Sequence, residues 1–342
     1  MFGKKKSTVG LDIGSSSIKV VEIARERSGD HLINYGVSEP LSEAIVDGEI
    51  MDRQMVHEAI TNLMESRQIR TKSVATAVSG RAVIVKKILM DRLNEEDAKE
   101  AIQWEAEQHV PYDINDVSLD FQIINPNVDA KKMQVLLVAA KKDMVQNHAD
   151  IIREAGLTPT IIDVDSFAIQ NAIEANYEFL PGETVALVNI GAEITNLNIV
   201  RDGVPHFTKD LSVGSNSFVE GIQRRHNVSQ AEALQALRGR NESGIDVTAI
   251  VQTASEDLSV QIDRAISFLK SAGDADRIDR ILVSGGSARI TGLTDFLSGR
   301  HHVPVSVVNP VQRMSFDPGL FGGDLPEAVA PMLTVAIGLA LR

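Results

Sequence analysis

The first residues that could do chemistry form a small turn directly after the apolar segment 9–13. The turn offers backbone amides and hydroxyls from Gly14, Ser15, Ser16 and Ser17. Successive N–H groups in such a turn form a concavity that binds anions, and serine hydroxyls add donors. This pattern predicts a phosphate site, although an ordinary hairpin turn would fit it equally well.

Two charged residues flank this turn. Asp12 would repel a phosphate unless a divalent cation, Mg²⁺, lay between them and was held through water. Lys19 follows the turn and could neutralise a phosphate as a point charge. A solvated surface lysine is the plain alternative. The two charges therefore predict a cation-assisted phosphate site at Asp12.

Two later turns have the same make-up. Asn189 and Gly191 end the apolar segment 187–190, and the turn Gly285-Gly286-Ser287 follows the apolar segment 281–284. Paired glycines permit a ligand to approach the backbone closely. A turn such as Gly285-Gly286-Ser287, taken alone, is more often structural. Three such turns, two of them related by a repeat, favour a ligand in a cleft between two similar halves.

The chain is built twice on one plan, which predicts an α/β fold of two related halves. Each half opens as strand, glycine turn, strand, hairpin and strand, and then continues into helices. The first set of strands covers 9–13, 18–24 and 31–37, with a helix at 52–66. The second covers 187–190, 194–200 and 205–211, with helices at 215–225 and 247–270 and a last helix at 327–341.

Additional elements interrupt the first half. They are predicted as strands at 82–90, 119–124 and 134–140 and helices at 94–110 and 143–155. We predict three units: a first half of residues 1–81 and 160–180, a small inserted α+β subdomain of residues 82–159, and a second half of residues 181–342.

Composition excludes several classes of protein. The 342 residues contain no cysteine, so disulfide scaffolds, cysteine nucleophiles and Cys-ligated metals are excluded. A net charge of −13 and 4% aromatic residues disfavour nucleic acid as a partner. No apolar run is long enough to cross a bilayer, which predicts a cytoplasmic protein. His301 and His302 lack metal-ligand spacing and are predicted to be solvated loop residues.

These motifs resemble the actin, heat-shock chaperone and sugar-kinase superfamily of ATP-binding proteins. The two phosphate loops match residues 11–19 and 189–195, and the adenosine motif matches 281–293. The connecting helices match 163–168 and 336–340. The resemblance implies duplicated ribonuclease-H-like domains that bind ATP and Mg²⁺. The implied nucleotide-binding residues are Asp12, Gly14, Ser15, Ser16, Ser17, Lys19, Asn189, Gly191, Gly214, Ser215, Glu232, Gln235, Gly285, Gly286, Ser287 and Arg289.

Within this superfamily the chain resembles the PilM family of type IV pilus assembly proteins. The residues that carry this resemblance are 103–111, 135–142 and 155–157. It implies a cytoplasmic adaptor that docks the N-terminal tail of the inner-membrane protein PilN. It also implies links to the pilus platform protein and motor ATPases, and allows a homo-oligomer. Trp104, Val110 and Pro111 lie in the region matching the family's tail-binding groove, which involves the inserted subdomain.

Two departures from the superfamily pattern concern catalysis. Asn189 stands where the second phosphate loop usually carries aspartate, and an amide cannot orient Mg²⁺ and water by charge. Gln235 stands where a lysine is usual, and Glu232 also fits a capping box with Ser229. We therefore predict ATP binding with weak or no hydrolysis and assign no catalytic residue.

Two other functions stay open at this stage. One is an FtsA-like cytoskeletal or cell-division filament protein. The other is a small-molecule kinase, for which Asp163 and Asp165 are the candidate bases toward a substrate hydroxyl.

Overall fold

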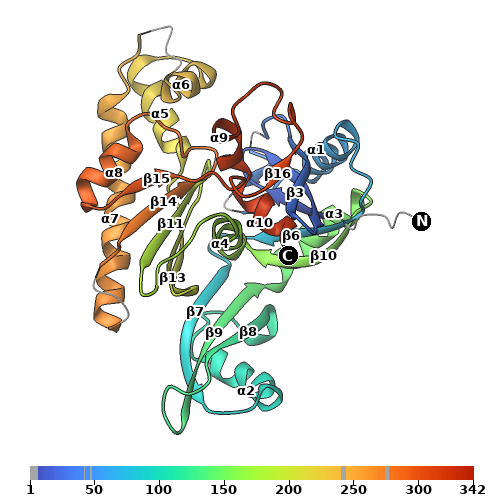
Figure 1. Ribbon diagram of the computed structural model, residues 1–342, viewed down its shortest axis with the longest axis vertical. Helices are drawn as coiled ribbons and strands as arrows, with labels where there is room; N and C mark the ends of the chain where they lie inside the picture. The colour runs from blue at the N-terminus through green and yellow to red at the C-terminus, as the bar shows by residue number, and fades with distance from the viewer. Residues whose placement is uncertain (1–6, 42, 47, 240–243, 274–276) are drawn as a thin grey trace.

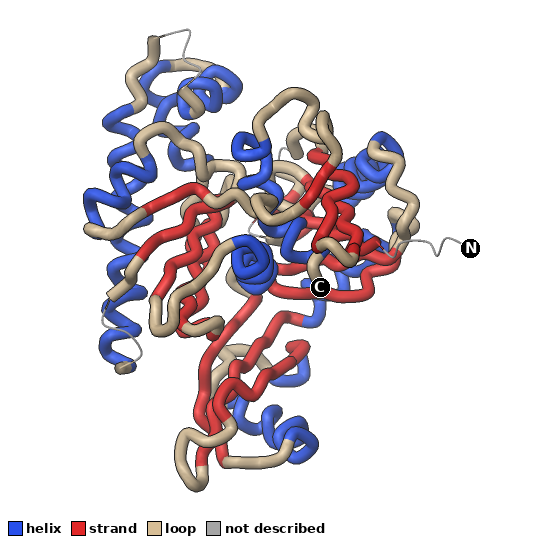
Figure 2. Tube along the Cα trace, viewed as in Figure 1, coloured by secondary structure: helices blue, strands red, loops and turns tan. Residues whose placement is uncertain are grey.

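Two α/β halves lie side by side, and a smaller unit extends from the region between them (Figures 1 and 2). The computed structural model describes residues 7–41, 43–46, 48–239, 244–273 and 277–342. The predicted α/β fold with a duplicated plan is confirmed, because both halves are built on a sheet with the same arrangement of strands.

The first half has a six-stranded sheet in the order β10-β6-β1-β2-β3-β16. The strands are β1 (Ser7–Ile13), β2 (Ile18–Glu26), β3 (Gly29–Val37), β6 (Ser73–Val78), β10 (Thr158–Val164) and β16 (Ser315–Phe316). β1, β2 and β3 are antiparallel, whereas β6 and β10 run parallel to β1. Helices α1 (Arg53–Ser66) and α3 (Lys142–Glu154) pack on this half.

The second half repeats the pattern in a five-stranded sheet, ordered β13-β12-β11-β14-β15. The strands are β11 (Thr184–Ile190), β12 (Thr195–Arg201), β13 (Val204–Leu211), β14 (Arg280–Ser284) and β15 (Val305–Val307). The helices are α5 (Ser215–His226), α6 (Gln230–Leu237), α7 (Thr248–Ala272) and α8 (Leu293–His301). β11 is buried at every position, which explains its mostly apolar sequence.

The small unit is a three-stranded antiparallel sheet with one helix. Its strands lie in the order β7-β9-β8, and their bounds are Val83–Asp91, Lys132–Lys141 and Val117–Asn125. Helix α2 (Glu95–Glu107) packs on the sheet and closes a separate core. Asn94 caps α2 by accepting the Asp97 N–H, as its sequence predicts.

Helix α3 lies within the predicted insertion of residues 82–159 but packs elsewhere. Ile151 and Ile152 of α3 are fully buried in the core of the first half, beside Leu11 and Ile60. The separate core of the insertion draws only on residues up to Ala139. By packing, the small unit therefore ends near residue 141.

Two helices cross where the halves meet. α4 (Asp165–Asn176) and α10 (Thr334–Ala340) are in close contact, and a Cβ on Gly338 would lie 1.7 Å from the Ala168 carbonyl oxygen. The crossing therefore brings the two backbones together without a side chain between them.

Two local predictions were wrong. The single last helix at 327–341 is instead α9 (Pro326–Val329), a 3₁₀ turn (Ala330–Leu333) and α10, because Pro331 lacks the N–H that a continuous helix needs. His301 ends α8 and its side chain is only 4% exposed, with Nδ1 3.4 Å from an Asp263 carboxylate oxygen. It is therefore not a solvated loop residue.

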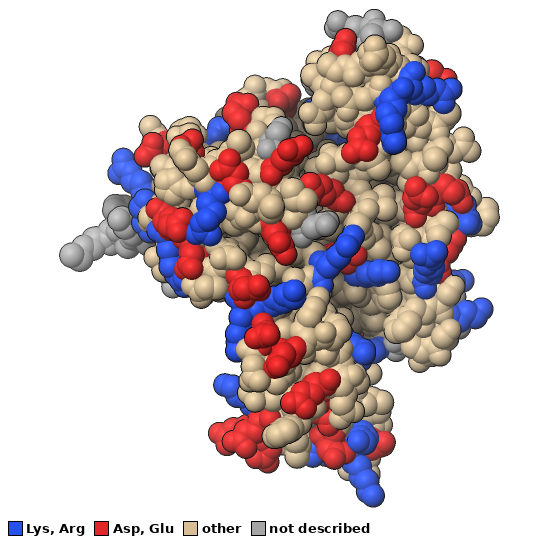
Figure 3. Space-filling model, turned by 180° about the vertical axis from the view of Figure 1, so that it is seen from behind, with Lys and Arg blue, Asp and Glu red and all other residues tan. Residues whose placement is uncertain are grey.

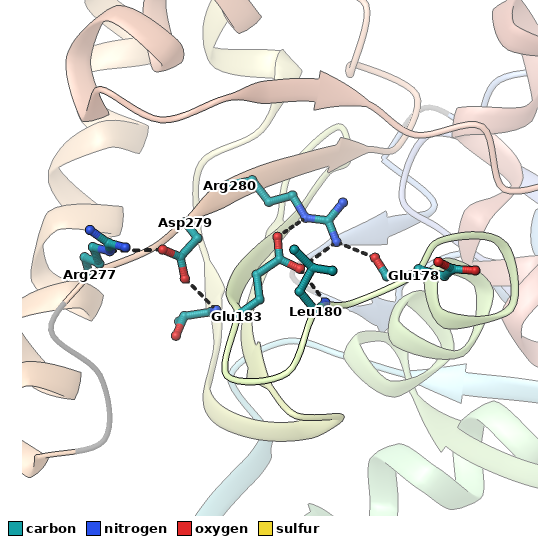
Figure 4. Close-up of polar contacts among 7 residues, drawn as sticks. Glu178, Leu180, Glu183, Arg277, Asp279 and Arg280 are labelled. Atoms are coloured by element: carbon teal, nitrogen blue, oxygen red, sulfur yellow. Dashed lines mark hydrogen bonds and ion pairs between the residues drawn. The ribbon is translucent and has the colours of Figure 1, made fainter.

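A cluster of ion pairs and hydrogen bonds holds the segment between α4 and β11 against the second sheet (Figure 4). At the start of β14, Arg280 Nε lies 2.8 Å from Glu183 Oε1, and its Nη2 donates to the Glu178 carbonyl. The guanidinium also lies over the Phe179 ring. Asp279 accepts the Thr184 N–H. This cluster lies at the end of β14 opposite to the Ser284 turn.

We expect Arg280→Met to lower the free energy of unfolding by about 3 kcal/mol, because it leaves a largely buried Glu183 carboxylate unpaired. Urea unfolding measures this loss. Arg277→Met is the control, since the Arg277 side chain is 83% exposed and pairs with Asp279 at the surface. Equal, small effects of both variants would contradict a stabilising role for the cluster.

Candidate functional site

The predicted first turn joins β1 to β2 and holds an ion pair. Asp12 and Lys19 are register partners on the two strands, and Lys19 Nζ lies 3.4 Å from Asp12 Oδ2. A Cβ on Gly14 would lie 2.9 Å from that Nζ, so glycine leaves room for the lysine head. Ser15 and Ser17 are partly buried beside it and Ser16 is exposed. The predicted charges are thus adjacent.

The second turn packs against the start of α5. The Ser215 N–H donates to the Gly191 carbonyl, and a Cβ on Gly214 would lie 2.3 Å from the Ala192 oxygen. Gly214 and Ser215 are therefore held directly against the turn, and their contact with a nucleotide stays a prediction. Asn189 lies at the end of β11, only 8% exposed, with both ends of its amide hydrogen-bonded.

The third turn lies against the second. Gly285 has φ of +94°, and a Cβ there would lie 2.4 Å from the Ile190 oxygen, so this position requires glycine. Ser287 Oγ reaches the Gly191 carbonyl at 3.5 Å. Gly286 is exposed, and its Cβ would meet no atom within 4 Å. The two turns of the second half thus form one surface, with open space at Gly286.

The remaining predicted nucleotide-binding residues are exposed at the surface, outside the three turns. Arg289 is exposed and donates to the Glu327 carbonyl at 2.8 Å. Glu232 and Gln235 are exposed on α6, and Glu232 completes a capping box with Ser229. The predicted capping role of Glu232 is therefore present. A nucleotide contact by these side chains stays a prediction.

Asp165, at the start of α4, lies near the first turn. Burial, and then the charge of Asp12, raise the pKa of the Asp165 carboxyl to about 7. Its side chain is hydrogen-bonded to Ser79, and the charge of Asp210 raises the pKa further. The other candidate base, Asp163, instead pairs with Arg342 near the chain end. Of the two candidate bases, only Asp165 lies near the other acidic residues, Asp12 and Asp210.

Four residues of this region escaped sequence analysis: Ser79, Gly80, Asn196 and Asp210. Gly80 donates its N–H to Asp210 Oδ2 at 2.5 Å, and Asn196 donates to Asp210 Oδ1 at 2.8 Å. Burial raises the pKa of the Asp210 carboxyl, while these two donors oppose the shift. A signal was present, because Ser79-Gly80 is a fourth small-residue turn at the end of an apolar strand.

The raised pKa of Asp165 predicts a pH-dependent stability. Between about pH 4 and 7 the unfolded chain has this carboxyl ionised while the folded chain keeps it protonated, so stability falls as pH rises. The slope from this one group is at most about 1.4 kcal/mol per pH unit. Urea unfolding at pH 5 and 7.5 should show a smaller fall for Asp165→Asn than for the unchanged chain. Parallel pH profiles would contradict the assignment.

A hollow lies at the base of the insertion. A cavity of about 120 Å³ is lined by Gly48, Glu49, Ile50, Lys141, Asp143, Met144, Asn147 and His148. Within it, burial lowers the pKa of His148 to about 4, and His148 Nε2 lies 2.8 Å from the Thr76 hydroxyl. The imidazole is therefore neutral at physiological pH.

The predicted partner residues lie away from this hollow. Trp104 is 73% exposed on α2, whereas Val110 is 6% exposed and belongs to the core of the insertion. Pro111 is exposed just beyond α2. The first turn of α2 is acidic, with Glu95, Glu96 and Asp97, and acidic side chains gather on the insertion, at the bottom of Figure 3.

Comparison with known proteins identifies the family. The family model for type IV pilus assembly protein PilM matches residues 10–342. The chain belongs to the PilM family. A solved structure titled as a PilM-PilN type IV pilus biogenesis complex is 27% identical, with a TM-score of 0.88, over 99% of this chain and 98% of that one. This PilM-family chain is therefore a type IV pilus assembly protein.

More distant structures share the fold of this PilM-family chain. The ethanolamine utilization protein EutJ from Carboxydothermus hydrogenoformans is 15% identical, with a TM-score of 0.60, over 98% of this chain and 89% of that one. MreB 5 of Spiroplasma citri bound to AMPPNP is 12% identical, with a TM-score of 0.56, over 98% and 95%. These likenesses confirm the actin-like fold that the sequence predicted.

Two kinds of feature are absent from the described residues. None of their helices combines the length and the apolar run that crossing a membrane requires. No three histidine or acidic side chains among them are arranged to hold a metal ion. The predicted Mg²⁺, held through water at Asp12, stays a prediction.

Proposed function

We propose that this chain is an ATP-binding adaptor that docks the N-terminal cytoplasmic tail of PilN during type IV pilus assembly. The observation that carries the proposal is the likeness to a PilM-PilN complex over nearly the whole of both chains. Through PilN, the adaptor would lie at the cytoplasmic face of the inner membrane and link to the platform protein and motor ATPases.

The hollow at the base of the insertion is the proposed docking groove for the tail. It combines backbone and polar side chains from the first half with Lys141 at the end of β9, so it lies where the insertion meets the first half. A peptide bound there would contact both units and fix the angle between them. Trp104, exposed at α2, is a second proposed contact for the pilus machinery.

The charges around the first turn suit a nucleotide that carries a divalent cation. Lys19 is next to Asp12, and the charges of Asp12 and Asp210 both raise the pKa of the Asp165 carboxyl. A phosphate alone would add negative charge to this group, whereas Mg²⁺ would offset it. The space at Gly286, on the opposite half, leaves room for the nucleoside. MreB 5, which shares the fold, is bound to AMPPNP.

The second turn favours binding over turnover. Asn189 is neutral, and its amide oxygen and nitrogen are hydrogen-bonded to Ser284 and Asn196 at 3.0 Å each. It therefore lacks the charge that would orient Mg²⁺ and an attacking water. ATP in this site would act as a ligand that stabilises the closed form of the two halves.

A second candidate function is phosphoryl transfer from ATP to water or a substrate hydroxyl. The observation that favours it is Asp165, whose pKa of about 7 suits a general base at neutral pH. Its side chain lies near Asp12 rather than on the second turn, so it would act from the first half. Steady phosphate release that Asp165→Asn abolishes would establish this function.

Calorimetric titration of the nucleotide-stripped protein with Mg-ATP tests the proposal first. Binding heat that returns to baseline is expected. Heat that continues after each injection would indicate turnover and favour the second candidate. A titration of a synthetic PilN N-terminal peptide follows, with Met144→Glu in the groove as the test variant and Met55→Glu, an exposed residue of α1, as control. Equal peptide affinity in both variants would contradict docking in this groove.

A further inference from the structure

A row of polar side chains crosses four adjacent strands of the second sheet. Ser284 on β14 donates its hydroxyl to Asn189 Oδ1 on β11 at 3.0 Å. Asn189 Nδ2 donates to Asn196 Oδ1 on β12 at 3.0 Å, and Asn196 Nδ2 donates to Asp210 Oδ1 on β13 at 2.8 Å. Each pair is directly opposite in strand register. The row therefore runs from the third turn to the edge of the sheet.

The row has one direction, and Asp210 sets it. Both carboxyl oxygens of Asp210 accept hydrogen bonds, one from the Gly80 N–H and the other from Asn196, so Asn196 turns its NH₂ group toward Asp210. Its carbonyl then faces Asn189, which must in turn offer its own NH₂ group and accept from Ser284. Asn189, Asn196 and Ser284 are all less than 9% exposed, so water cannot easily replace a lost partner. The orientation of Ser284 is thus fixed from three strands away.

Beyond Asp210 the row continues into the first half. The Gly80 N–H donates to the other carboxylate oxygen of Asp210 at 2.5 Å. Ser79, the preceding residue, is hydrogen-bonded to Asp165 beside the first turn. The Ser79 carbonyl oxygen lies 2.8 Å from the position of a Cβ on Gly48, and Gly48 lines the hollow at the base of the insertion. A shift of residues 79–80 would therefore move the wall of that hollow.

We infer that Asp210 is a positioning residue that couples a nucleoside triphosphate in the cleft to a peptide in the groove at the base of the insertion. This inference rests on the proposed function, since it needs both ligands. A nucleotide that pulls on the third turn changes the hydrogen bond of Ser284. The change passes along the row to Asp210 and the loop at Gly80, and from there to Gly48.

The same row explains Asn189. Aspartate at this position could not donate to Asn196, whose carbonyl would then face a carboxylate. The row therefore requires the amide, and Asn189→Asp should weaken the coupling between the ligands rather than restore hydrolysis.

Asp210→Asn tests the coupling. Asparagine keeps the size of the side chain but can accept from only one of its two donors, so the row must reverse its direction or break. We would measure the affinity of the full chain for a PilN N-terminal peptide with and without saturating Mg-ATP. The unchanged protein should show a ratio of at least about fivefold between the two affinities. In Asp210→Asn this ratio should fall to within about twofold of one. Because the lost charge is expected to change the affinity for Mg-ATP itself, Mg-ATP is supplied at saturation for each variant.

Two further variants separate coupling from stability. Asn196→Ala interrupts the row without touching Asp210 and should abolish the ratio as well. Thr208→Val is the control, because Thr208 donates to Asn198 on the same pair of strands, next to the row but outside it. It loses one hydrogen bond and should keep the ratio. A variant that only destabilises the fold would lower both affinities together and leave their ratio unchanged.

The outcomes test the coupling separately from the proposed function. A wild-type ratio of one, with both ligands bound, would overturn the coupling and leave the proposed function standing. Wild-type coupling retained in Asp210→Asn or Asn196→Ala would show that the row does not carry it. Failure of the unchanged protein to bind Mg-ATP or the peptide would overturn the proposed function, and the coupling with it.

Discussion

Gly286→Asp is expected to weaken Mg-ATP binding by roughly a hundredfold, about 3 kcal/mol, with the fold intact. The new Cβ would meet no atom within 4 Å, and Gly286 does not have a positive φ, so the substitution fits the turn. Its carboxylate would then lie in the space where the nucleotide is proposed to bind, and would repel the phosphates. Calorimetric titration with Mg-ATP measures the loss.

Gly286→Ser is the matched control, because it adds a Cβ and a polar atom but no charge. It should change the affinity for Mg-ATP by no more than about threefold, or 0.7 kcal/mol. If Gly286→Asp binds Mg-ATP as tightly as Gly286→Ser, the third turn does not face the nucleotide. Since ATP is proposed to favour the closed form, the aspartate variant should also bind the PilN peptide less tightly when ATP is present.

Gly338→Ala should lower the free energy of unfolding by about 3 kcal/mol or more, through crowding of a well-packed contact. The added Cβ would lie 1.7 Å from the Ala168 carbonyl oxygen and 2.5 Å from its carbon, so the two helices would have to separate. These are backbone atoms of a buried helix and cannot rotate away as a side chain could. Urea unfolding measures the effect.

Gly299→Ala provides the comparison for this substitution. Gly299 lies within α8, and its Cβ would meet nothing within 4 Å. Alanine at this position should stabilise the protein by about 0.5–1 kcal/mol, because it favours the helix without a clash. If both alanine variants unfold at the same urea concentration, the crossing of α4 and α10 does not require glycine.

The repeat was readable in the sequence because it depends on local patterns. Apolar strands that end in glycine turns occur twice at the same spacing, and the structure pairs them in two similarly ordered sheets. The break in the last helix was harder to place. Residues 327–341 are rich in helix-favouring residues, and the position of the interruption depends on Pro331, whose carbonyl accepts the Gly285 N–H. That bond joins segments 46 residues apart.

The candidate site was predictable only in part. The glycine turns and Asp12 could be predicted, because their residue types at the end of an apolar strand are typical of a phosphate site. Asp210 has no such signature, because it lies within the alternation of an ordinary strand, β13, and gains its partners from β12 and the Gly80 loop. Asp163 and Asp165 are two residues apart, and the sequence does not say which one lies near Asp12. The packing of α4 and the position of Arg342 decide it.

The insertion joins the first half through two neighbouring strands. Val83 and Ala140 are register partners, and the Lys141 N–H donates to the Ala82 carbonyl, so the chain leaves and returns at the same place. The segment has a core of its own, as an independently folding domain does. A single insertion or deletion in the gene could therefore add or remove it without changing the strand order of the two large sheets. An engineered chain with a tight turn in place of residues 84–139 should keep the two halves, and other modules could be grafted at this stem.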